Sequence, residues 1–281
     1  MSKSLILLID IDGTLVDTDK HLSYAMTAQY AKYGLHFEPH EFFEPKTFAM
    51  PNKDGAMEVA TTMLFGASWE VNYYYLKSKI PDAPVDVQTF RKEIVDRVTS
   101  NHDGVIPRCD VIETVLALRE HCKANNIGFS AVAVTNGAGT EARANLKIVE
   151  AEGLVVDGLV NADDVEIPFR KPHPKPYLMG YEIACDVLRR NGYNLEGACV
   201  VALEDSPPGA RSALAAGEIY DGLCYYIPTT KRAILIPQMT DAQLDRFVVQ
   251  QDVSALGMHI KTQLHGRGTR ATMQIQARAA L

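Results

Sequence analysis

Short apolar runs recur along this chain with the length and composition of buried β-strands. Each is rich in valine, isoleucine or leucine and is shorter than the roughly ten residues expected of a helix. The runs are Leu5–Ile9, Phe129–Val134, Gly158–Val160, Cys199–Leu203 and Leu223–Ile227. Strands that are apolar on both faces are typical of parallel sheets, because helices cover both sides of such a sheet. The pattern therefore predicts a buried parallel sheet.

Helical patterns lie between the later runs. Residues 110–122 (DVIETVLALREHC) place Val111, Val115 and Leu118 on one face at helical spacing. In residues 206–217 (SPPGARSALAAG), a serine N-cap, prolines in the first turn and a final glycine mark the start and end of another helix. Strands that alternate with helices indicate an α/β fold with a parallel sheet.

One region breaks this alternation. After the first strand, no comparable strand occurs before about Asp103, and three stretches have helical character. These stretches are residues 21–34 (HLSYAMTAQYAKYG), 54–66 (DGAMEVATTMLFG) and 89–100 (TFRKEIVDRVTS). The sequence therefore predicts an α/β core formed by residues 1–18 and 104–257, with an all-helical insertion at residues 19–103.

The C-terminal segment differs in charge from the rest of the chain. Residues 258–281 contain four lysines or arginines, no aspartate or glutamate, and little periodicity. We expect a basic, mobile tail there, with a packed helix as the alternative. An arm that binds nucleic acid is disfavoured because the whole chain is acidic.

Composition narrows the classes of function. A formal net charge of −7 disfavours nucleic acid and anionic membranes as main partners. The five cysteines form no C-x-x-C motif, as is typical of reduced thiols in an intracellular protein. No run reaches the roughly 18 apolar residues of a membrane span, and the apolar start of the chain is too short for a signal peptide. We therefore expect a soluble cytoplasmic protein, monomeric or homodimeric.

Polar side chains follow several of the predicted strands, at the edge where open α/β sheets bind ligands. They are Asp10, Asp12, Thr135, Asn136, Lys171, Glu204 and Asp205. Four carboxylates in one cleft repel each other unless a cation lies among them, and hard oxygen ligands suit Mg²⁺. The sequence therefore predicts a Mg²⁺ site, for which the candidate ligands are Asp10, Asp12, Glu204 and Asp205.

Four segments resemble, in order and spacing, the motifs of the haloacid dehalogenase-like (HAD) hydrolase superfamily. They are residues 10–18 (DIDGTLVDT), 134–137 (VTNG), 170–177 (RKPHPKPY) and 202–217 (ALEDSPPGARSALAAG). The resemblance spans residues 5–17 and 103–227. It implies a Rossmann-like parallel sheet with an inserted α-helical cap domain. With such an insertion, the chain resembles most the branch of the superfamily that contains phosphoglycolate phosphatase and β-phosphoglucomutase.

The two aspartates of the first motif suit phosphoryl transfer from a phosphate monoester. Asp10 is positioned to attack phosphorus in line and form an aspartyl-phosphate. Asp12 lies one bend further on, which Gly13 permits, and would protonate the leaving alcohol and then deprotonate water. The resemblance implies that the backbone carbonyl of Asp12 is a metal ligand. It also implies C–O–P chemistry, because dehalogenating and phosphonate-cleaving relatives lack this second aspartate.

The other motifs supply the remaining parts of a phosphate site. Thr135 and Asn136, near a helix N-terminus, are candidates to bind phosphoryl oxygens. Lys171 would offset the clustered negative charges and is a further candidate to bind phosphate. Asp205, with Glu204, would complete the metal shell. The predicted catalytic residues are therefore Asp10, Asp12, Thr135 and Lys171.

The function expected from these residues is a Mg²⁺-dependent phosphatase that acts on a small phosphorylated metabolite, a sugar phosphate or a phosphoglycolate-like compound. A phosphomutase would use the same aspartyl-phosphate with a sugar hydroxyl as the acceptor. A receiver-like signalling module and a non-catalytic binding protein are alternatives from other classes. A receiver domain has its phospho-accepting aspartate on a later strand and no helical domain after the first strand.

Three further features invite a functional interpretation. Residues 137–142 (GAGTEA) fit a G-x-G-x-x-A dinucleotide pattern with Asp157 downstream, but this pattern leaves the other motifs unexplained. Lys53 in the insertion is a candidate to bind a second anionic group of the substrate. His21 lies one position early for a substrate-binding histidine of this branch, so we assign it no role.

Overall fold

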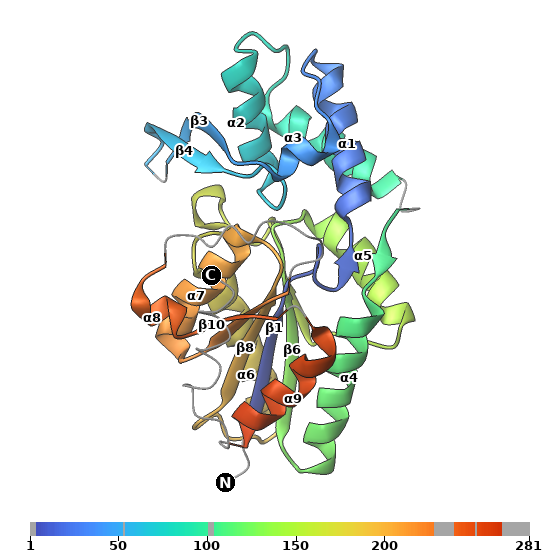
Figure 1. The fold of residues 1–281 in the computed structure, drawn as a ribbon, viewed down its shortest axis with the longest axis vertical. Helices are drawn as coiled ribbons and strands as arrows, with labels where there is room; N and C mark the ends of the chain where they lie inside the picture. The colour runs from blue at the N-terminus through green and yellow to red at the C-terminus, as the bar shows by residue number, and fades with distance from the viewer. Residues whose placement is uncertain (1–3, 53, 101–103, 228–238, 251, 266–281) are drawn as a thin grey trace.

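The computed structural model describes residues 4–52, 54–100, 104–227, 239–250 and 252–265. Within these residues, six parallel strands form one sheet in the order β10-β9-β8-β1-β6-β7 (Figure 1). The strands are β1 (Ser4–Ile9), β6 (Gly128–Val134), β7 (Gly158–Val160), β8 (Cys199–Glu204), β9 (Leu223–Tyr226) and β10 (Phe247–Val249). The α/β fold class is confirmed. The short strand β10 has no counterpart among the predicted runs.

Strand β1 lies inside the sheet and is buried on both faces. Leu5, Leu7 and Ile9 belong to one hydrophobic core, and Ile6 and Leu8 belong to the core on the opposite face. This division follows from the two-residue period of a strand. Because β6 and β8 pair with β1 on its two sides, the residues that follow β1 emerge near the middle of the sheet edge.

Helices cover both faces of the sheet. Those that contribute side chains to the first core are α4 (Cys109–Ala124), α5 (Gly139–Ala151) and α9 (Val253–Leu264). Those that contribute to the second core are α6 (Lys175–Arg190) and α7 (Pro207–Tyr220). A short helix, α8 (Asp241–Leu244), precedes β10. This two-sided cover explains why the strands are continuous apolar runs.

An inserted segment, residues 18–105, follows β2 (Val16–Asp17) and returns at β5 (Ile106–Pro107). It contains α1 (Asp19–Lys32), α2 (Trp69–Lys79) and α3 (Val87–Ser100), with a short 3₁₀ helix at Pro39–Phe43. In Figure 1 these helices lie beyond the edge of the sheet at which β1 ends. The segment has a hydrophobic core of its own, in which the Tyr30 ring contacts several other aromatic rings.

The inserted segment is not made of helices alone, which corrects the prediction for residues 54–66. Strands β3 (Lys46–Pro51) and β4 (Met57–Thr62) pair as an antiparallel hairpin. The Asn52 side chain accepts hydrogen bonds from the backbone N–H groups of Asp54 and Ala56 and so shapes the turn. Side chains from the two strands also pair across the hairpin, as the hydroxyls of Thr47 and Thr61 show at 2.9 Å.

The predicted boundary between residues 257 and 258 falls inside α9. Ile260 and Leu264 are buried in the core that α4 and α9 share, so residues 258–264 are part of a packed helix rather than a mobile tail. Residues 266–281 lie outside the described residues. No helix in the described part of the chain has both the length and the apolar composition that crossing a bilayer requires.

Candidate active site

The turn after β1 directs Asp10 and Asp12 to different parts of one site. The carbonyl of Ile11 accepts hydrogen bonds from the N–H groups of Thr14, Leu15 and Val16, which closes a tight turn. Gly13 has a φ of +86°, a conformation that residues with a Cβ rarely adopt. A straight strand would place the carboxylates of Asp10 and Asp12, which are two residues apart, on the same face. The turn separates them, so that Asp10 contacts Lys171 while Asp12 contacts Thr135 at the same sheet edge.

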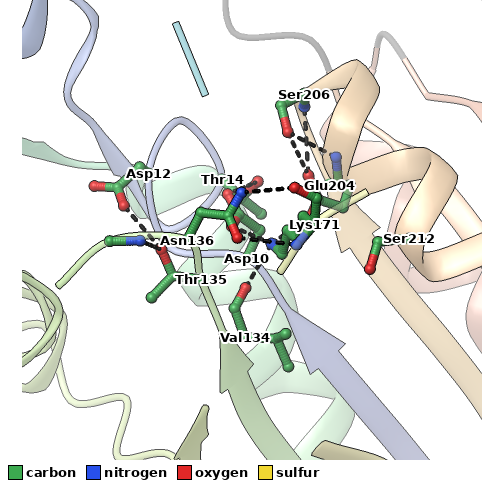
Figure 2. Close-up of polar contacts among 12 residues, drawn as sticks. Asp10, Asp12, Thr14, Val134, Thr135, Asn136, Lys171, Glu204, Ser206 and Ser212 are labelled. Carbon is green, nitrogen blue, oxygen red and sulfur yellow. Dashed lines mark hydrogen bonds and ion pairs between the residues drawn. The ribbon is translucent and has the colours of Figure 1, made fainter. Parts of the chain in front are cut away.

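Lys171 is the centre of a buried polar network. Its ammonium donates to Asp10 Oδ1 at 2.7 Å, to Glu204 Oε1 at 2.6 Å and to the Val134 carbonyl at 2.7 Å. Figure 2 shows this ammonium between the ends of the strands that carry Asp10 and Glu204. An ammonium has three donors, and all three are used here.

Glu204 is saturated with hydrogen bonds. Besides Lys171, its Oε1 accepts from the Tyr177 hydroxyl at 2.6 Å, and its Oε2 accepts from the backbone N–H and the hydroxyl of Ser206 at 3.4 and 3.1 Å. A carboxylate offers about four lone-pair sites. A Cβ on Gly209 would lie 2.0 Å from Oε1, so the first turn of α7 also encloses this carboxylate.

The electrostatics of the site follow from burial and from these charge partners. Burial and the negative charge of Glu204 raise the pKa of Asp10 well above its ordinary value, against the opposing effect of Lys171. Burial lowers the pKa of Lys171, but Asp10 and Glu204 outweigh it, so the pKa lies above the ordinary value. Lys171 is therefore a permanent cation that favours the ionised form of Asp10.

Asp12 has a separate set of partners. Its Oδ2 accepts from the Thr135 hydroxyl at 3.1 Å and its Oδ1 accepts from the Asn145 side chain at 2.9 Å. Burial raises the pKa of Asp12, although these two hydrogen bonds lower it in part. The raised pKa favours a carboxyl group that can both hold and release a proton. Thr135 in turn accepts from the Gly137 N–H at 2.9 Å, so its orientation is fixed.

A cavity of about 40 Å³ lies over these residues. Its polar lining includes Asp10, Asp12, Thr135, Lys171 and Asp205. This volume has room for roughly three water molecules at about 10–15 Å³ each. The cavity therefore holds a small group and not a whole metabolite, whose binding sites measure about 300–1,000 Å³.

Asn136 positions the Lys171 backbone. Its Oδ1 accepts from the Lys171 N–H at 3.1 Å, and its Nδ2 donates to the Lys171 carbonyl at 3.3 Å. This pair of bonds fixes the loop that carries the lysine. Asn136 also lines the cavity, where it was predicted to bind phosphate.

The acidic groups fit a divalent metal ion. Carboxylate oxygens of Asp10, Glu204 and Asp205 lie within 4.8 Å of one another and are buried. Oxygen donors of this kind suit Mg²⁺. A Cβ on Gly13 would lie 1.9 Å from Asp205 Oδ2, so the turn after β1 makes room for that carboxylate. The Asp12 side chain is not part of this group.

The inserted segment closes over the site through the N-terminal turn of α2. Trp69 Nε1 donates to Glu141 Oε2 at 3.3 Å, and both residues line the small cavity. Glu70, 3% exposed, pairs with Arg91 at 3.2 Å and with Arg170, the residue before Lys171. These contacts could not be predicted from the sequence, because no local motif links α2 to the loop at Arg170.

The structure brings seven of the predicted site residues to one sheet edge: Asp10, Asp12, Thr135, Asn136, Lys171, Glu204 and Asp205. Sequence reasoning did not find the partners Asn145, Tyr177 and Ser206, although the tyrosine and the serine lie inside the recognised motifs. Lys53 lies outside the described residues. His21 Nε2 contacts the Val98 carbonyl at 2.9 Å within the inserted segment.

The alternative of a dinucleotide site at residues 137–142 is not supported. Asp163 Oδ2 accepts from the Gly139 N–H at 2.9 Å, and Glu141 occupies the same helix N-terminus. These two carboxylates take the place that a pyrophosphate would need at the start of α5. Asp157 accepts from the Ala131 N–H in the sheet.

Comparisons with known proteins agree with the fold and the motifs. A family model described as haloacid dehalogenase-like hydrolase matches residues 6–217. One similar solved structure is a proposed β-phosphoglucomutase from Bacteroides vulgatus, with a TM-score of 0.59, 15% identity, and coverage of 94% of this chain and 90% of that chain. Another is a predicted phosphoglycolate phosphatase from Haemophilus somnus. Its TM-score is 0.57 and its identity 16%, with coverage of 93% of this chain and 99% of that chain.

A third similar structure is CbbY from Rhodobacter sphaeroides in complex with xylulose-1,5-bisphosphate. Its TM-score is 0.55 and its identity 18%, with coverage of 88% of this chain and 94% of that chain. At these identities the likeness establishes a shared fold. The search of curated proteins gave no match.

Proposed function

Because this chain belongs to the haloacid dehalogenase-like hydrolase family, we propose that it is a Mg²⁺-dependent phosphatase of small phosphorylated metabolites that acts through an aspartyl-phosphate. The observation that carries this proposal is the hydrogen bond from the Lys171 ammonium to Asp10, beneath the small cavity that Asp12 also lines. The solved relatives that are named as a phosphoglycolate phosphatase and a sugar-phosphate mutase support this substrate class.

Asp10 is the proposed nucleophile. Lys171 donates to Oδ1 at 2.7 Å, whereas Oδ2 accepts a longer hydrogen bond from the Thr14 hydroxyl at 3.5 Å and is the oxygen proposed to attack phosphorus. The ammonium opposes the rise in the Asp10 pKa that burial causes, and it limits the rotation of the carboxylate. Attack forms the bond from Asp10 to phosphorus while the ester oxygen leaves, and hydrolysis by water then restores the carboxylate.

Asp12 is the proposed general acid and base. Its raised pKa favours the protonated form, which can give a proton to the leaving ester oxygen, and the resulting carboxylate can take a proton from the attacking water. Thr135 and Asn145 hold the two oxygens of this carboxyl group, so its orientation does not depend on the substrate.

Asp10 and Asp205 are the side chains proposed to hold Mg²⁺, together with the predicted backbone carbonyl of Asp12. A bound Mg²⁺ would supply charge neutralisation for the phosphoryl oxygens. We assign Glu204 instead to the positioning of Lys171, because four hydrogen bonds already use its acceptor sites.

The direct test measures phosphate release from p-nitrophenyl phosphate with Mg²⁺, with and without EDTA, and with sugar phosphates analysed for free phosphate and for isomerised product. Asp10→Asn should lower kcat by several orders of magnitude. Asp186→Asn, on the exposed face of α6, is the matched control and should leave kcat unchanged. Wild-type turnover that persists in EDTA, or in Asp10→Asn, would contradict the proposed chemistry.

A further inference from the structure

A second cavity adjoins the phosphate site. Its volume is about 660 Å³, within the range of metabolite-binding sites, whereas the cavity over Asp10 measures only about 40 Å³. The two share Ala67 and Lys171 in their linings. Among the described residues, the larger cavity therefore offers room for the organic part of a phosphorylated metabolite whose phosphoryl group lies over Asp10.

The larger cavity lies between the β3–β4 hairpin and α7. Arg211, in the second turn of α7, belongs to its lining. The next residue, Ser212, lies on α7 (Figure 2). It donates from its hydroxyl to the His173 carbonyl at 2.6 Å and so fixes α7 against the loop that follows Lys171. Arg211 is thus held on the same rigid support as the catalytic lysine.

Arg211 has no hydrogen-bonding partner in the part of the chain that the structure describes. Its Nε is buried and makes no hydrogen bond. Burial lowers the pKa of its guanidinium, and no carboxylate offsets that effect. A buried donor without an acceptor is costly, and a guanidinium presents a planar fork that matches a carboxylate or phosphate. The side chain is therefore prepared for an anion that the protein itself does not provide.

None of the other charged groups in the described cavity lining forms an ion pair with Arg211. Arg170 is paired with Glu70, and Lys171 is paired with Asp10 and Glu204. Glu58 is the acidic residue among the described lining residues, and it is exposed on β4 with no ion pair to Arg211.

We propose that Arg211 binds a second anionic group of the substrate, a carboxylate or a second phosphate, so that the preferred substrates are phosphate monoesters with an anion at the far end of the molecule. This inference rests on the proposed phosphatase function. Substrate selection would then depend on α7 of the core as well as on the inserted segment. In that segment, Lys53 was the predicted candidate to bind a second anionic group.

The test uses two substrate pairs that differ in one anionic group. The pair 3-phosphoglycerate and glycerol 3-phosphate differs by a carboxylate, and the pair fructose 1,6-bisphosphate and fructose 6-phosphate differs by a phosphate. The quantity measured is the ratio of kcat/KM within each pair. In the wild type the ratio should favour the doubly anionic member of at least one pair.

Arg211→Met should lower that ratio by on the order of ten- to a hundredfold, the contribution of hydrogen bonds to a charged group. Arg211→Lys keeps the charge without the fork and should give an intermediate ratio. Arg190→Met, on the exposed surface of α6, is the control and should keep the wild-type ratio. Loss of the unsatisfied guanidinium leaves no group unpaired, so the methionine variant should remain folded.

The pair whose ratio depends on Arg211 identifies the second anion. Ratios that are equal in the wild type and in Arg211→Met for both pairs would overturn the inference, while phosphate release from p-nitrophenyl phosphate would still support the phosphatase. A wild type that releases phosphate from none of these compounds would instead refute the proposed function.

Discussion

Two glycines shape the reactive centre by leaving space for carboxylates. Gly13 has Asp205 where its Cβ would be, and Gly209 has Glu204 in the same relation. The first of these carboxylates is proposed to hold the metal, and the second holds Lys171. The absence of a side chain at these positions therefore determines where two negative charges lie.

Gly13→Ala should abolish most of the activity. The added methyl group would displace the Asp205 carboxylate, and the φ of +86° would also strain the backbone. Gly34→Ala is the matched control, because Gly34 has a φ of +84° but no atom within 4 Å of a Cβ, so it carries the strain alone. Phosphate release and the Mg²⁺ concentration for half-maximal rate would be measured for both. Equal losses in the two variants would contradict the role of Asp205.

At the residue scale, the placement of a polar side chain could be predicted from sequence where that residue follows a strand. Asp10 and Thr135 lie directly after an apolar run and Asp205 lies one residue further on, so their meeting at one edge could be predicted. The role of Glu204 as the hydrogen-bonding partner of Lys171 could not be predicted. Its four hydrogen bonds come from three separate parts of the chain, which are α6, the start of α7 and the loop that carries Lys171.

At the scale of elements, the N-terminal turn of α2 is the main polar contact between the inserted segment and the core. Glu70 is the shared partner of Arg91, within the same segment, and Arg170, in the loop before Lys171. Arg91 also pairs with Asp163 of the core. The position of the inserted segment is therefore linked to the loop that carries Lys171.

Glu70→Gln should destabilise the protein by about 3 kcal/mol, because the buried Arg170 guanidinium loses its carboxylate partner, whereas Arg91 keeps Asp163. It should also lower kcat/KM, since the loop at Arg170 would lose its ion pair to α2. Urea unfolding and steady-state kinetics measure the two effects. Lys92→Gln removes one partner of an exposed ion pair on α3 and should change the unfolding free energy by less than about 0.5 kcal/mol. Similar effects of the two substitutions would refute the link.

The β3–β4 hairpin shows why one element was assigned wrongly from sequence. Residues 54–66 have neither proline nor strict alternation of polar and apolar residues, so a helix was a reasonable prediction. In the structure, the turn at Asn52 and the pairing with residues 46–51 decide the conformation. Strand propensity depends on such partners more strongly than helix propensity does.

At the scale of the whole molecule, Glu141 couples the contact between the segment and the core to pH. Burial and the nearby Asp12 raise the pKa of Glu141 from an ordinary value of 4.5 to about 8. The folded state therefore binds the Glu141 proton more tightly than the unfolded state does. This contribution to stability is fully present below about pH 4.5 and is lost as the pH rises towards 8.

Part of the free energy of unfolding should accordingly be lost as the pH rises from 5 to 8. Glu141→Gln should remove this part of the pH dependence, because glutamine stays neutral. Denaturant titrations at several pH values measure both slopes. Glu150→Gln, at an exposed position of the same helix, should retain the wild-type slope. A Glu141→Gln variant with the wild-type pH dependence would show that another group is responsible.

The inserted segment has a hydrophobic core of its own and is joined to the rest of the chain at a single place. Strands β2 and β5 pair side by side, with Val16 opposite Pro107 and Asp17 opposite Ile106, so the segment begins and ends at one place. Doubling the length of a loop closed at its base costs only about 0.6 kcal/mol. Evolution, or a designer, can therefore exchange residues 18–105 for an unrelated module and leave the reactive centre intact, provided that the new module carries its own counterparts of Trp69 and Glu70.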